Sequence, residues 1–285
     1  NFSIYFHRSI KQSEMCMSQI PFFVTMPHSG EKIPDRCDWL KNLPETVLMC
    51  DVDRYIDVLY EPTLSRLKIT SHKTEWHRYA VDLNRIPSDI DETSVIGSKN
   101  PAGSFNRGFH WVVTTYNDQL MPKPIDPKLH EDLKQLIYDP FHSKVQAIYK
   151  SYKDEGFKNI FHLDAHSMPS LGTKMHKDPG EKRADIVISD SLGKSCNIKF
   201  RDLVIAAYVA AGFKVGYNWP YVGGRLTEQY GQPSQGQHTI QVELNRELYM
   251  DEKTKKIKDS HQDVQIKIAK ALSYIQSELP LLIKQ

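Results

Sequence analysis

The sequence predicts an α/β fold with a mixed, mostly parallel sheet flanked by helices. Short apolar runs typical of buried strands alternate along the chain with longer segments of helical periodicity. The 285 residues are 40% hydrophobic and 25% charged, an ordinary globular composition that can form a large core. No internal repeat or low-complexity linker divides the chain. We therefore expect one domain over residues 17–285, preceded by a non-core extension over residues 1–16.

The first third of the chain is predicted to contain three strands and one helix. Residues 22–26 are a short apolar run between two prolines, which is too short for a helix. Apolar side chains recur at helical spacing in residues 51–66, where Pro62 is an expected kink. A turn and the start of a second strand follow over 65–70. Residues 76–83 (WHRYAVDL) are rich in aromatic and β-branched side chains and are the third predicted strand.

Residues 86–128 are predicted to form one long loop, because they hold many Pro, Gly, Ser and Asn residues and little periodicity. A loop of this length within a compact domain is usually functional, and this one can form a lid. The elements predicted beyond it are a helix over 129–154 with a possible break at Pro140, a strand over 159–163, a polar loop over 170–183, a strand over 184–189, a helix over 198–212 that Gly212 can cap, strands over 213–217 and 238–244, and a closing helix over 260–284.

Charge and cysteine content exclude several functions. The formal charge is +2, from 37 basic and 35 acidic residues, which gives no electrostatic reason to expect nucleic acid or an anionic membrane as a partner. No apolar stretch approaches the length of a membrane span. The four cysteines are widely spaced without a C-x-x-C motif, so we expect free thiols in a reducing, cytoplasmic compartment. The oligomeric state stays open.

Polar clusters follow or close three of the predicted strands. They are His28-Ser29-Gly30-Glu31, Asp82-Leu83-Asn84-Arg85 and Asp164-Ala165-His166. Ligands of open α/β sheets gather at the carboxyl ends of strands, so we expect these clusters to meet there.

Two histidines and one carboxylate suit zinc, whose catalytic sites keep one position open for water. His28 and His166 offer the imidazoles, and either Glu31 or Asp53 can offer the carboxylate. Asp164 can hydrogen-bond a ligand histidine from outside. The alternative is that each histidine is an ordinary hydrogen-bonded polar residue and that Asp164 only forms a turn.

Two further groups have both a functional and a structural interpretation. Asn84-Arg85 places an amide beside a guanidinium that can bind a carboxylate, but Arg85 can also pair with a neighbouring aspartate. Glu243 lies in the strand HTIQVEL, and alternation puts it on the same face as Gln241. Because a buried carboxylate is costly, Glu243 is either a general base acting on a metal-activated water or the partner of Arg246.

Taken in order, these segments resemble the N-formylglutamate amidohydrolase family, also called N-formylglutamate deformylases. The resemblance covers about residues 20–250 and rests on PHSG, D-x-D-x-x-x-D, VDLNR, DAHSM and EQYGQPSQGQHTIQVELNRELY. The family is similar in fold to zinc carboxypeptidases and to aminoacylases such as aspartoacylase. Its members hydrolyse N-formyl-L-glutamate to formate and glutamate, a step of histidine catabolism.

The resemblance implies a metal site with one Zn²⁺ per chain. His28, His166 and Asp53 would be its ligands. Glu31 is a rival to Asp53, because its His-x-x-Glu spacing from His28 matches the zinc motif of the carboxypeptidase and aspartoacylase relatives.

The resemblance also implies roles around the substrate. Asn84 and Arg85 would hold one substrate carboxylate, and Arg225 would meet the second. Glu243 would be the general base, and Arg54 would help to polarise the formyl carbonyl.

Two other functions stay open from the sequence. The chain can be another zinc amidase or carboxypeptidase on the same frame, or a non-catalytic binder of an acidic metabolite whose metal serves only structure. The partner expected for the main interpretation is a small acidic N-acyl amino acid.

Overall fold

The computed structural model describes residues 20–283. The expected extension over residues 1–16 and the domain start near Met17 therefore lie outside the described residues. The strands are β1 (Phe22–Met26), β2 (Thr70–Lys73), β3 (Ile160–Met168), β4 (Ile186–Ser189), β5 (Val215–Tyr217) and β6 (Gln237–Asn245). The helices are α1 (Asp38–Lys41), α2 (Glu45–Leu48), α3 (Ile56–Leu67), α4 (Pro127–Leu133), α5 (Asp139–Asp154), α6 (Ile198–Ala210), α7 (Arg225–Tyr230) and α8 (His261–Ile283), with a π-helix at Lys134–Tyr138 and 3₁₀ turns at Pro233–Gln235 and Arg246–Leu248.

Within residues 20–283, the six strands form one sheet in the order β2-β1-β3-β6-β4-β5. Neighbouring strands are parallel except for β4 and β6, which are antiparallel. This arrangement confirms the predicted mixed, mostly parallel sheet. Because β1, β3 and β6 are adjacent and parallel, their carboxyl ends meet at one edge of the sheet.

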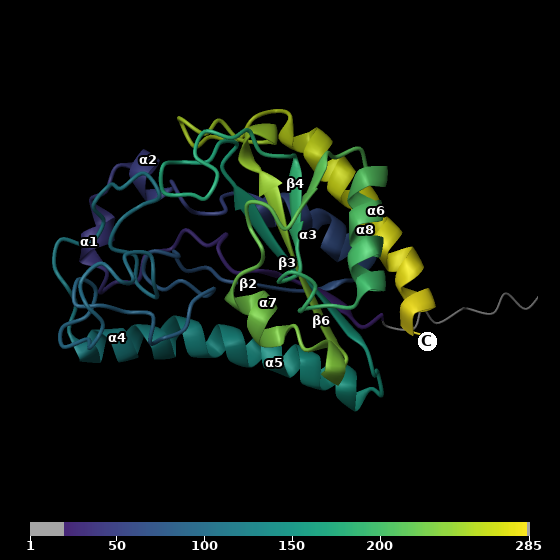
Figure 1. Cartoon of the computed structure of the whole chain (residues 1–285), viewed down its shortest axis with the longest axis horizontal. Helices are drawn as coiled ribbons and strands as arrows, with labels where there is room; N and C mark the ends of the chain where they lie inside the picture. Colours follow the sequence, from purple (N-terminus) through teal and green to yellow (C-terminus); the bar gives the residue numbers. More distant parts are fainter. Residues whose placement is uncertain (1–19, 284–285) are drawn as a thin grey trace, which may run out of the picture.

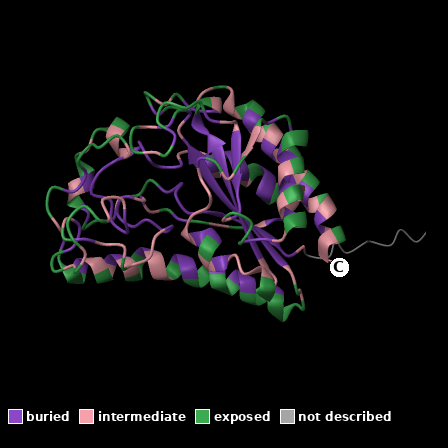
Figure 2. Cartoon of the chain, in the orientation of Figure 1, coloured by how far each residue is buried: buried purple, intermediate pink, exposed green. Residues whose placement is uncertain are grey.

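The two faces of the sheet are packed differently (Figures 1 and 2). α3, α6 and α8 cover one face with a hydrophobic core, while α4, α5 and the long loop lie against the other. Strand alternation decides which residues face which layer. In β3, Phe161, Leu163 and Ala165 enter the apolar core, and His162, Asp164 and His166 share the opposite face. All of β3 is buried, so its polar residues lie inside the molecule.

The predicted third strand, residues 76–83, is wrong, because this segment forms turns and makes only an isolated bridge at Trp76. Its backbone bonds run to other loops, for example from the Asp82 amide to the Phe109 carbonyl at 2.9 Å. Tyr79 and Val81 are nevertheless buried. Aromatic and β-branched residues are frequent in strands partly because strands are buried. Here the same residues are buried in a loop that packs on the core.

Two boundaries also differ from the prediction. The first long helix begins at Ile56 instead of residue 51, because Tyr55 adopts a left-handed backbone with φ of 69°. The Asp53 amide instead donates to the His28 carbonyl at 2.9 Å, which ties the segment before the helix to the end of β1. β3 continues to Met168, so Asp164 and His166 lie within the strand and do not follow it.

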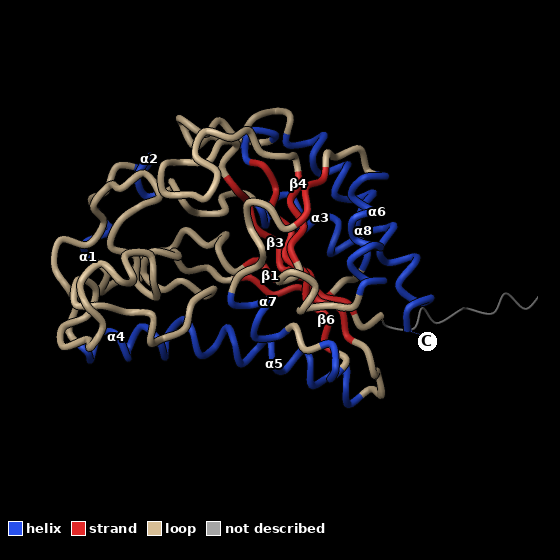
Figure 3. The backbone as a smooth tube through the Cα atoms, viewed as in Figure 1, coloured by secondary structure: helices blue, strands red, loops and turns tan. Residues whose placement is uncertain are grey.

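The long helical segment is not broken at Pro140. α4, the π-helix and α5 follow one another without a gap from Pro127 to Asp154. Pro140 is in the first turn of α5, where its missing N–H is not needed. Residues 86–126 contain no helix or strand, only isolated bridges, as expected for the long loop (Figure 3). No helix between residues 20 and 283 is long and apolar enough to cross a membrane.

Candidate metal centre

His28 lies just past the end of β1, where the chain turns away from the sheet. Gly30 makes this turn possible, because a Cβ there would lie 2.4 Å from the carbonyl carbon of Glu75. Two residues later, the backbone N–H of Lys32 donates a hydrogen bond to the Glu75 carbonyl at 2.9 Å. Glycine therefore lets two loops pack together and leaves the His28 ring directed inward, 2% exposed.

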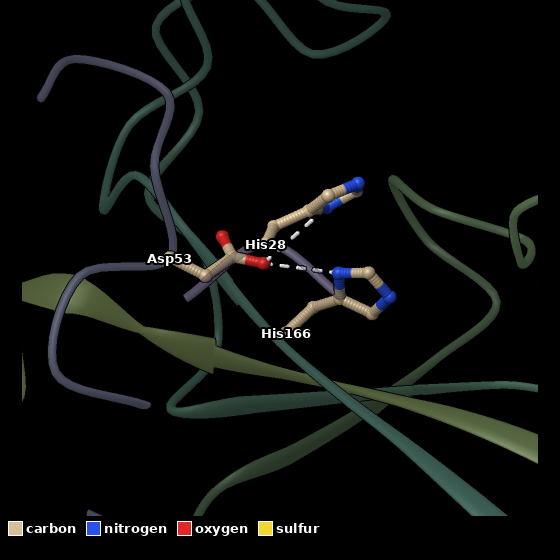
Figure 4. Close-up of side chains that lie close together, drawn as sticks. All are labelled: His28, Asp53 and His166. Atoms are coloured by element: carbon tan, nitrogen blue, oxygen red, sulfur yellow. Dashed lines mark hydrogen bonds and ion pairs between the residues drawn. The ribbon is translucent and has the colours of Figure 1, made fainter. Parts of the chain in front are cut away.

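Figure 4 shows His28, Asp53 and His166 converging from three separate segments. Asp53 Oδ2 lies 3.0 Å from Nδ1 of His166 and 3.6 Å from Nδ1 of His28. One potential ligand atom from each residue lies within 4.8 Å of the others, and all three side chains are buried. The sequence-predicted trio is thus brought together by the fold.

The outer nitrogen of each histidine is held by a carboxylate. Nε2 of His28 lies 2.8 Å from Asp82 Oδ1, and Nε2 of His166 lies 2.7 Å from Asp164 Oδ2. These bonds favour a proton on Nε2, so Nδ1, which faces Asp53, is the nitrogen of each ring that could bind a cation. Carboxylate–histidine pairs of this kind orient metal-binding imidazoles in proteins.

Two observations show that this site fits a cation. Nδ1 of His28 is buried and has no hydrogen-bond partner. Burial opposes ionisation of Asp53, but the two histidines outweigh it and hold the pKa of Asp53 well below its usual range. Burial likewise lowers the pKa of His166, but Asp164 and Asp53 together raise it well above the ordinary value. The space between His28, Asp53 and His166 therefore favours a positive charge.

Glu31 and Arg54 are turned away from the trio. Arg54 Nε donates to Glu31 at 2.9 Å, and its Nη1 donates to Glu45 at 2.8 Å. The side chain of Glu31 is 38% exposed. Neither residue lines the cavity beside the trio. The expected role of Arg54 at the formyl carbonyl is therefore not supported, and Asp53 is the carboxylate that meets the histidines.

Glu243 lies on the strand next to His166. The register of β3 and β6 pairs His166 with Glu243, so the two side chains share a face. Gln241 donates to Glu243 Oε1 at 2.6 Å and also accepts from the Gly224 amide at 2.7 Å. Burial raises the pKa of Glu243 to about 7. Such a carboxyl group can exchange a proton near neutral pH, which suits a general base.

Sequence reasoning missed the part that Arg246 plays here. Its Nη2 lies 3.1 Å from Asp53 Oδ1, and its Nε donates to Ser167 Oγ at 2.9 Å. Arg246 therefore orients Asp53, and it is not the ion-pair partner that the structural interpretation gave to Glu243. The signal that could have indicated Arg246 is its position directly after the strand that carries Glu243.

A cavity of about 300 Å³ opens beside the trio and is lined by Asn84, Arg85, Arg107 and Glu243 among others. Arg85 donates to the carbonyls of Asn84 and Arg107 at 2.9 and 3.0 Å. Nη1 of Arg107 is buried without a partner. Arg225 does not line this cavity; its side chain is 40% exposed and lies 3.6 Å from Glu228, although its Nε is also buried without a partner. Arg107 was missed because it lies in the long loop, where no pattern distinguishes it.

The fold and the site together define a class of protein, an α/β protein with a buried candidate metal centre beside a polar cavity. The family follows from direct comparison. The model of the family described as N-formylglutamate amidohydrolase matches residues 20–250, and the chain belongs to this family.

Relatives of known name support the same family. The chain is 28% identical over 237 residues to the N-formylglutamate deformylase of Pseudomonas aeruginosa, covering 82% of this chain and 84% of that protein. It is 26% identical over 238 residues to the N-formylglutamate deformylase of Pseudomonas putida, covering 82% and 83%.

Solved structures share the fold. The crystal structure of an N-formylglutamate amidohydrolase from Ralstonia eutropha JMP134 has a TM-score of 0.81 at 25% identity, covering 90% of this chain and 94% of that chain. A gene product of Agrobacterium tumefaciens has a TM-score of 0.67 at 17% identity, covering 94% and 93%, and shows the fold alone.

Proposed function

We propose that this protein hydrolyses N-formyl-L-glutamate, or a closely related N-acyl amino acid, to formate and L-glutamate with one Zn²⁺ per chain. The observation that carries the proposal is Glu243, a buried carboxylate in the same cavity as His28, Asp53 and His166. Family membership supports the substrate, because both named Pseudomonas relatives are N-formylglutamate deformylases.

His28, Asp53 and His166 would hold the zinc ion. When bound, zinc supplies Lewis acidity, which makes a neighbouring water more acidic and a carbonyl carbon more open to attack. Glu243 accepts the proton of the attacking water while the water oxygen bonds to the formyl carbon. It then delivers that proton to the glutamate nitrogen as the carbon–nitrogen bond breaks, so the same carboxylate is first a base and then an acid.

Two guanidinium groups would hold the two carboxylates of the substrate. Arg85, beside Asn84, binds one, and we assign the second to Arg107 in place of Arg225. Arg107 lines the cavity whereas Arg225 does not, and a substrate carboxylate would satisfy the buried, unpartnered Nη1 of Arg107. Fixing both ends of glutamate positions the formyl group, and positioning supplies much of the rate of such reactions.

A cytoplasmic location and a part in histidine catabolism belong to the same proposal. The location is supported by Cys37, Cys50 and Cys196, which are free, buried thiols, as is usual for proteins of reducing compartments. The part in histidine catabolism rests on the family alone. Intact-mass analysis of natively expressed protein, with and without alkylation after denaturation, would test the thiol state.

The experiment that tests the function measures metal content and formate release together. We expect about one zinc per chain, formate release from N-formyl-L-glutamate, loss of release after chelation and recovery on adding zinc. N-acetyl-L-glutamate and dipeptides should react poorly, because both Pseudomonas relatives are named for the formyl substrate. Bound zinc without formate would contradict the substrate, and activity that survives complete zinc removal would contradict the metal role.

A further inference from the structure

A line of buried polar side chains runs along the sheet from His166, away from the cavity. It passes through Asp164, Thr25, His162 and Tyr149 and ends at Thr239. The strand register produces the line, because Thr25 pairs with Asp164 and His162 pairs with Thr239 across neighbouring strands. Thr25, His162, Asp164 and Thr239 are all 0% exposed. No step of the proposed reaction uses Thr25 or His162.

The hydrogen bonds in this line can run in only one direction. The Asp164 carboxylate accepts, so the hydroxyl of Thr25 donates to its Oδ1 at 2.6 Å. Thr25 has no second proton, so His162 Nε2, 2.7 Å from Thr25 Oγ1, must donate to it. Nδ1 of the neutral His162 ring then accepts from the Tyr149 hydroxyl at 3.1 Å. The Tyr149 oxygen in turn accepts from Thr239 Oγ1 at 2.9 Å.

His162 is held as the neutral Nε2–H form. Its ring stacks on Phe23 with centroids 4.2 Å apart and planes 12° apart. Burial lowers the pKa of His162 to about 4, so the ring carries no charge at neutral pH. The ring therefore offers one donor and one acceptor, and both are used within the line.

The two histidines of the candidate metal centre are thus supported in different ways. Asp82, behind His28, accepts hydrogen bonds from the Arg78 guanidinium at 2.9 Å, from the Trp111 indole at 2.9 Å and from the backbone N–H of Asn84 at 2.8 Å. Asp164, behind His166, takes its remaining support from Thr25, through a line of uncharged groups. Loss of the Thr25 hydroxyl should therefore disturb Asp164 and His166. Loss of any one partner of Asp82 should disturb His28 less, because two other partners remain.

We propose that Thr25 and His162 are positioning residues for the metal centre, which fix the Asp164 carboxylate and thereby the orientation and tautomer of His166. This inference rests on the metal site of the proposed function. Removing the Thr25 hydroxyl leaves Asp164 Oδ1 and His162 Nε2 without their partner. Asp164 can then rotate away from His166, which weakens zinc binding. Partners behind metal ligands typically change metal affinity about 10–100-fold, and we expect about tenfold for this more distant residue.

The test compares Thr25→Val, Thr25→Ser and Thr63→Val in the full chain. Zinc dissociation constants are measured without substrate by competition with a chromophoric chelator, and urea unfolding of the metal-free proteins is measured in parallel. We expect about a tenfold weaker zinc affinity for Thr25→Val and a change below about threefold for Thr25→Ser, which keeps the hydroxyl. Thr63→Val is the matched control, because Thr63 is a buried threonine of α3 outside the line, and its zinc affinity should be unchanged.

A second measurement uses the unchanged protein, so it does not depend on whether a variant folds. Long-range ¹H–¹⁵N correlation spectra of the unchanged protein report which ring nitrogen of each histidine carries the proton. We expect His162 to be protonated at Nε2 and not at Nδ1. A proton on Nδ1 of His162, or an unchanged zinc affinity in folded Thr25→Val, would overturn the inference.

The two proposals can fail separately. A protein that binds no zinc overturns both the metal centre and this inference. A protein that shows the expected order of zinc affinities but releases no formate supports the inference while contradicting the proposed hydrolysis.

Discussion

Single residues carry most of the chemistry at this site, and each is oriented by one or two specific partners. Asp53 joins both histidines through one oxygen and Arg246 through the other. Glu31, at the spacing that seemed equally suitable in the sequence, pairs with Arg54 instead. The difference is one of tertiary position, since Glu31 is nearer to His28 along the chain and yet, of the two, only Asp53 meets the histidines.

Replacing Asp53 should abolish tight zinc binding, and replacing Glu31 should not. We expect Asp53→Asn to weaken zinc affinity by more than about a hundredfold, because a ligand should count for more than the partners behind it. Glu31→Gln is the matched control and should bind zinc within about threefold of the unchanged protein. Chelator competition measures both. Equal losses in the two variants would mean that Glu31 is also a ligand.

Replacing Glu243 should separate metal binding from turnover. Glu243→Gln keeps the size of the side chain but cannot take a proton from water. Turnover should fall by about two or more orders of magnitude, the usual scale for a lost general base, while zinc content stays the same. Formate release and metal analysis on the same preparation measure both quantities. Near-normal turnover would remove Glu243 from the mechanism.

Arg107 and Arg225 should differ in their effect on substrate binding. A hydrogen bond to a charged group contributes about 1.5–3 kcal/mol, so Arg107→Gln should raise KM for N-formyl-L-glutamate about tenfold or more. Arg225→Gln should change KM less than about threefold, because Arg225 does not line the cavity and its guanidinium lies beside Glu228. Steady-state kinetics measure both. The opposite order would return the second carboxylate to Arg225.

At the scale of elements, close packing between loops sets the positions of the site residues. Gly224 precedes α7 and packs directly on the side chain of Asn84. Asn84 Oδ1 accepts from the Leu226 amide at 2.8 Å, so this amide joins the start of α7 to the loop that carries Arg85. One wall of the cavity therefore depends on a glycine.

Gly224→Ala should damage the site although it adds only one methyl group. The new Cβ would lie 2.0 Å from Nδ2 of Asn84, so either the Asn84 side chain or one of the two loops must move. We expect kcat/KM to fall by about a hundredfold, as misplacement of about 1 Å can cause. Gly216→Ala in β5 is the control, because its Cβ has only ordinary contacts, the nearest at 3.4 Å. Similar activity of the two variants would show that this contact is unimportant.

At the scale of the molecule, two cores share one sheet. Leu163 belongs to the core under α3, α6 and α8, whereas Trp111 belongs to the core beside α5 and the long loop. Because β3 contributes to both cores, we propose that the chain folds as one domain.

A substitution in one core should therefore destabilise both. Leu163→Ala should lower the free energy of unfolding by about 2–5 kcal/mol, because it leaves a cavity in a fully buried position. Urea unfolding followed by circular dichroism, which the helices dominate, and by tryptophan fluorescence should show the same lowered midpoint. A fluorescence midpoint that stays unchanged would indicate two independently folding units.

The sequence predicted the elements whose side chains repeat with a regular period. β1 was located by its short apolar run between two prolines, and β6 and α8 by segments with the pattern of a strand and of a helix. Residues 76–83 were mistaken for a strand because composition records burial and does not record hydrogen-bond partners. Periodicity and composition are local properties, so they place elements better than they place loops.

The sequence by itself determined the fold class, the family resemblance and the residues His28, His166 and Glu243 as candidate members of one site, and it left Asp53 and Glu31 as alternatives for the carboxylate ligand. Only the tertiary structure decided between Asp53 and Glu31, moved Arg54 and Arg225 out of the site, and added Arg107 and Arg246. The physical reason is distance along the chain. The bond between His166 and Asp53 joins residues 113 positions apart, and that between Arg246 and Asp53 joins residues 193 apart. Strand order and loop packing bring such pairs together, and no local pattern records them.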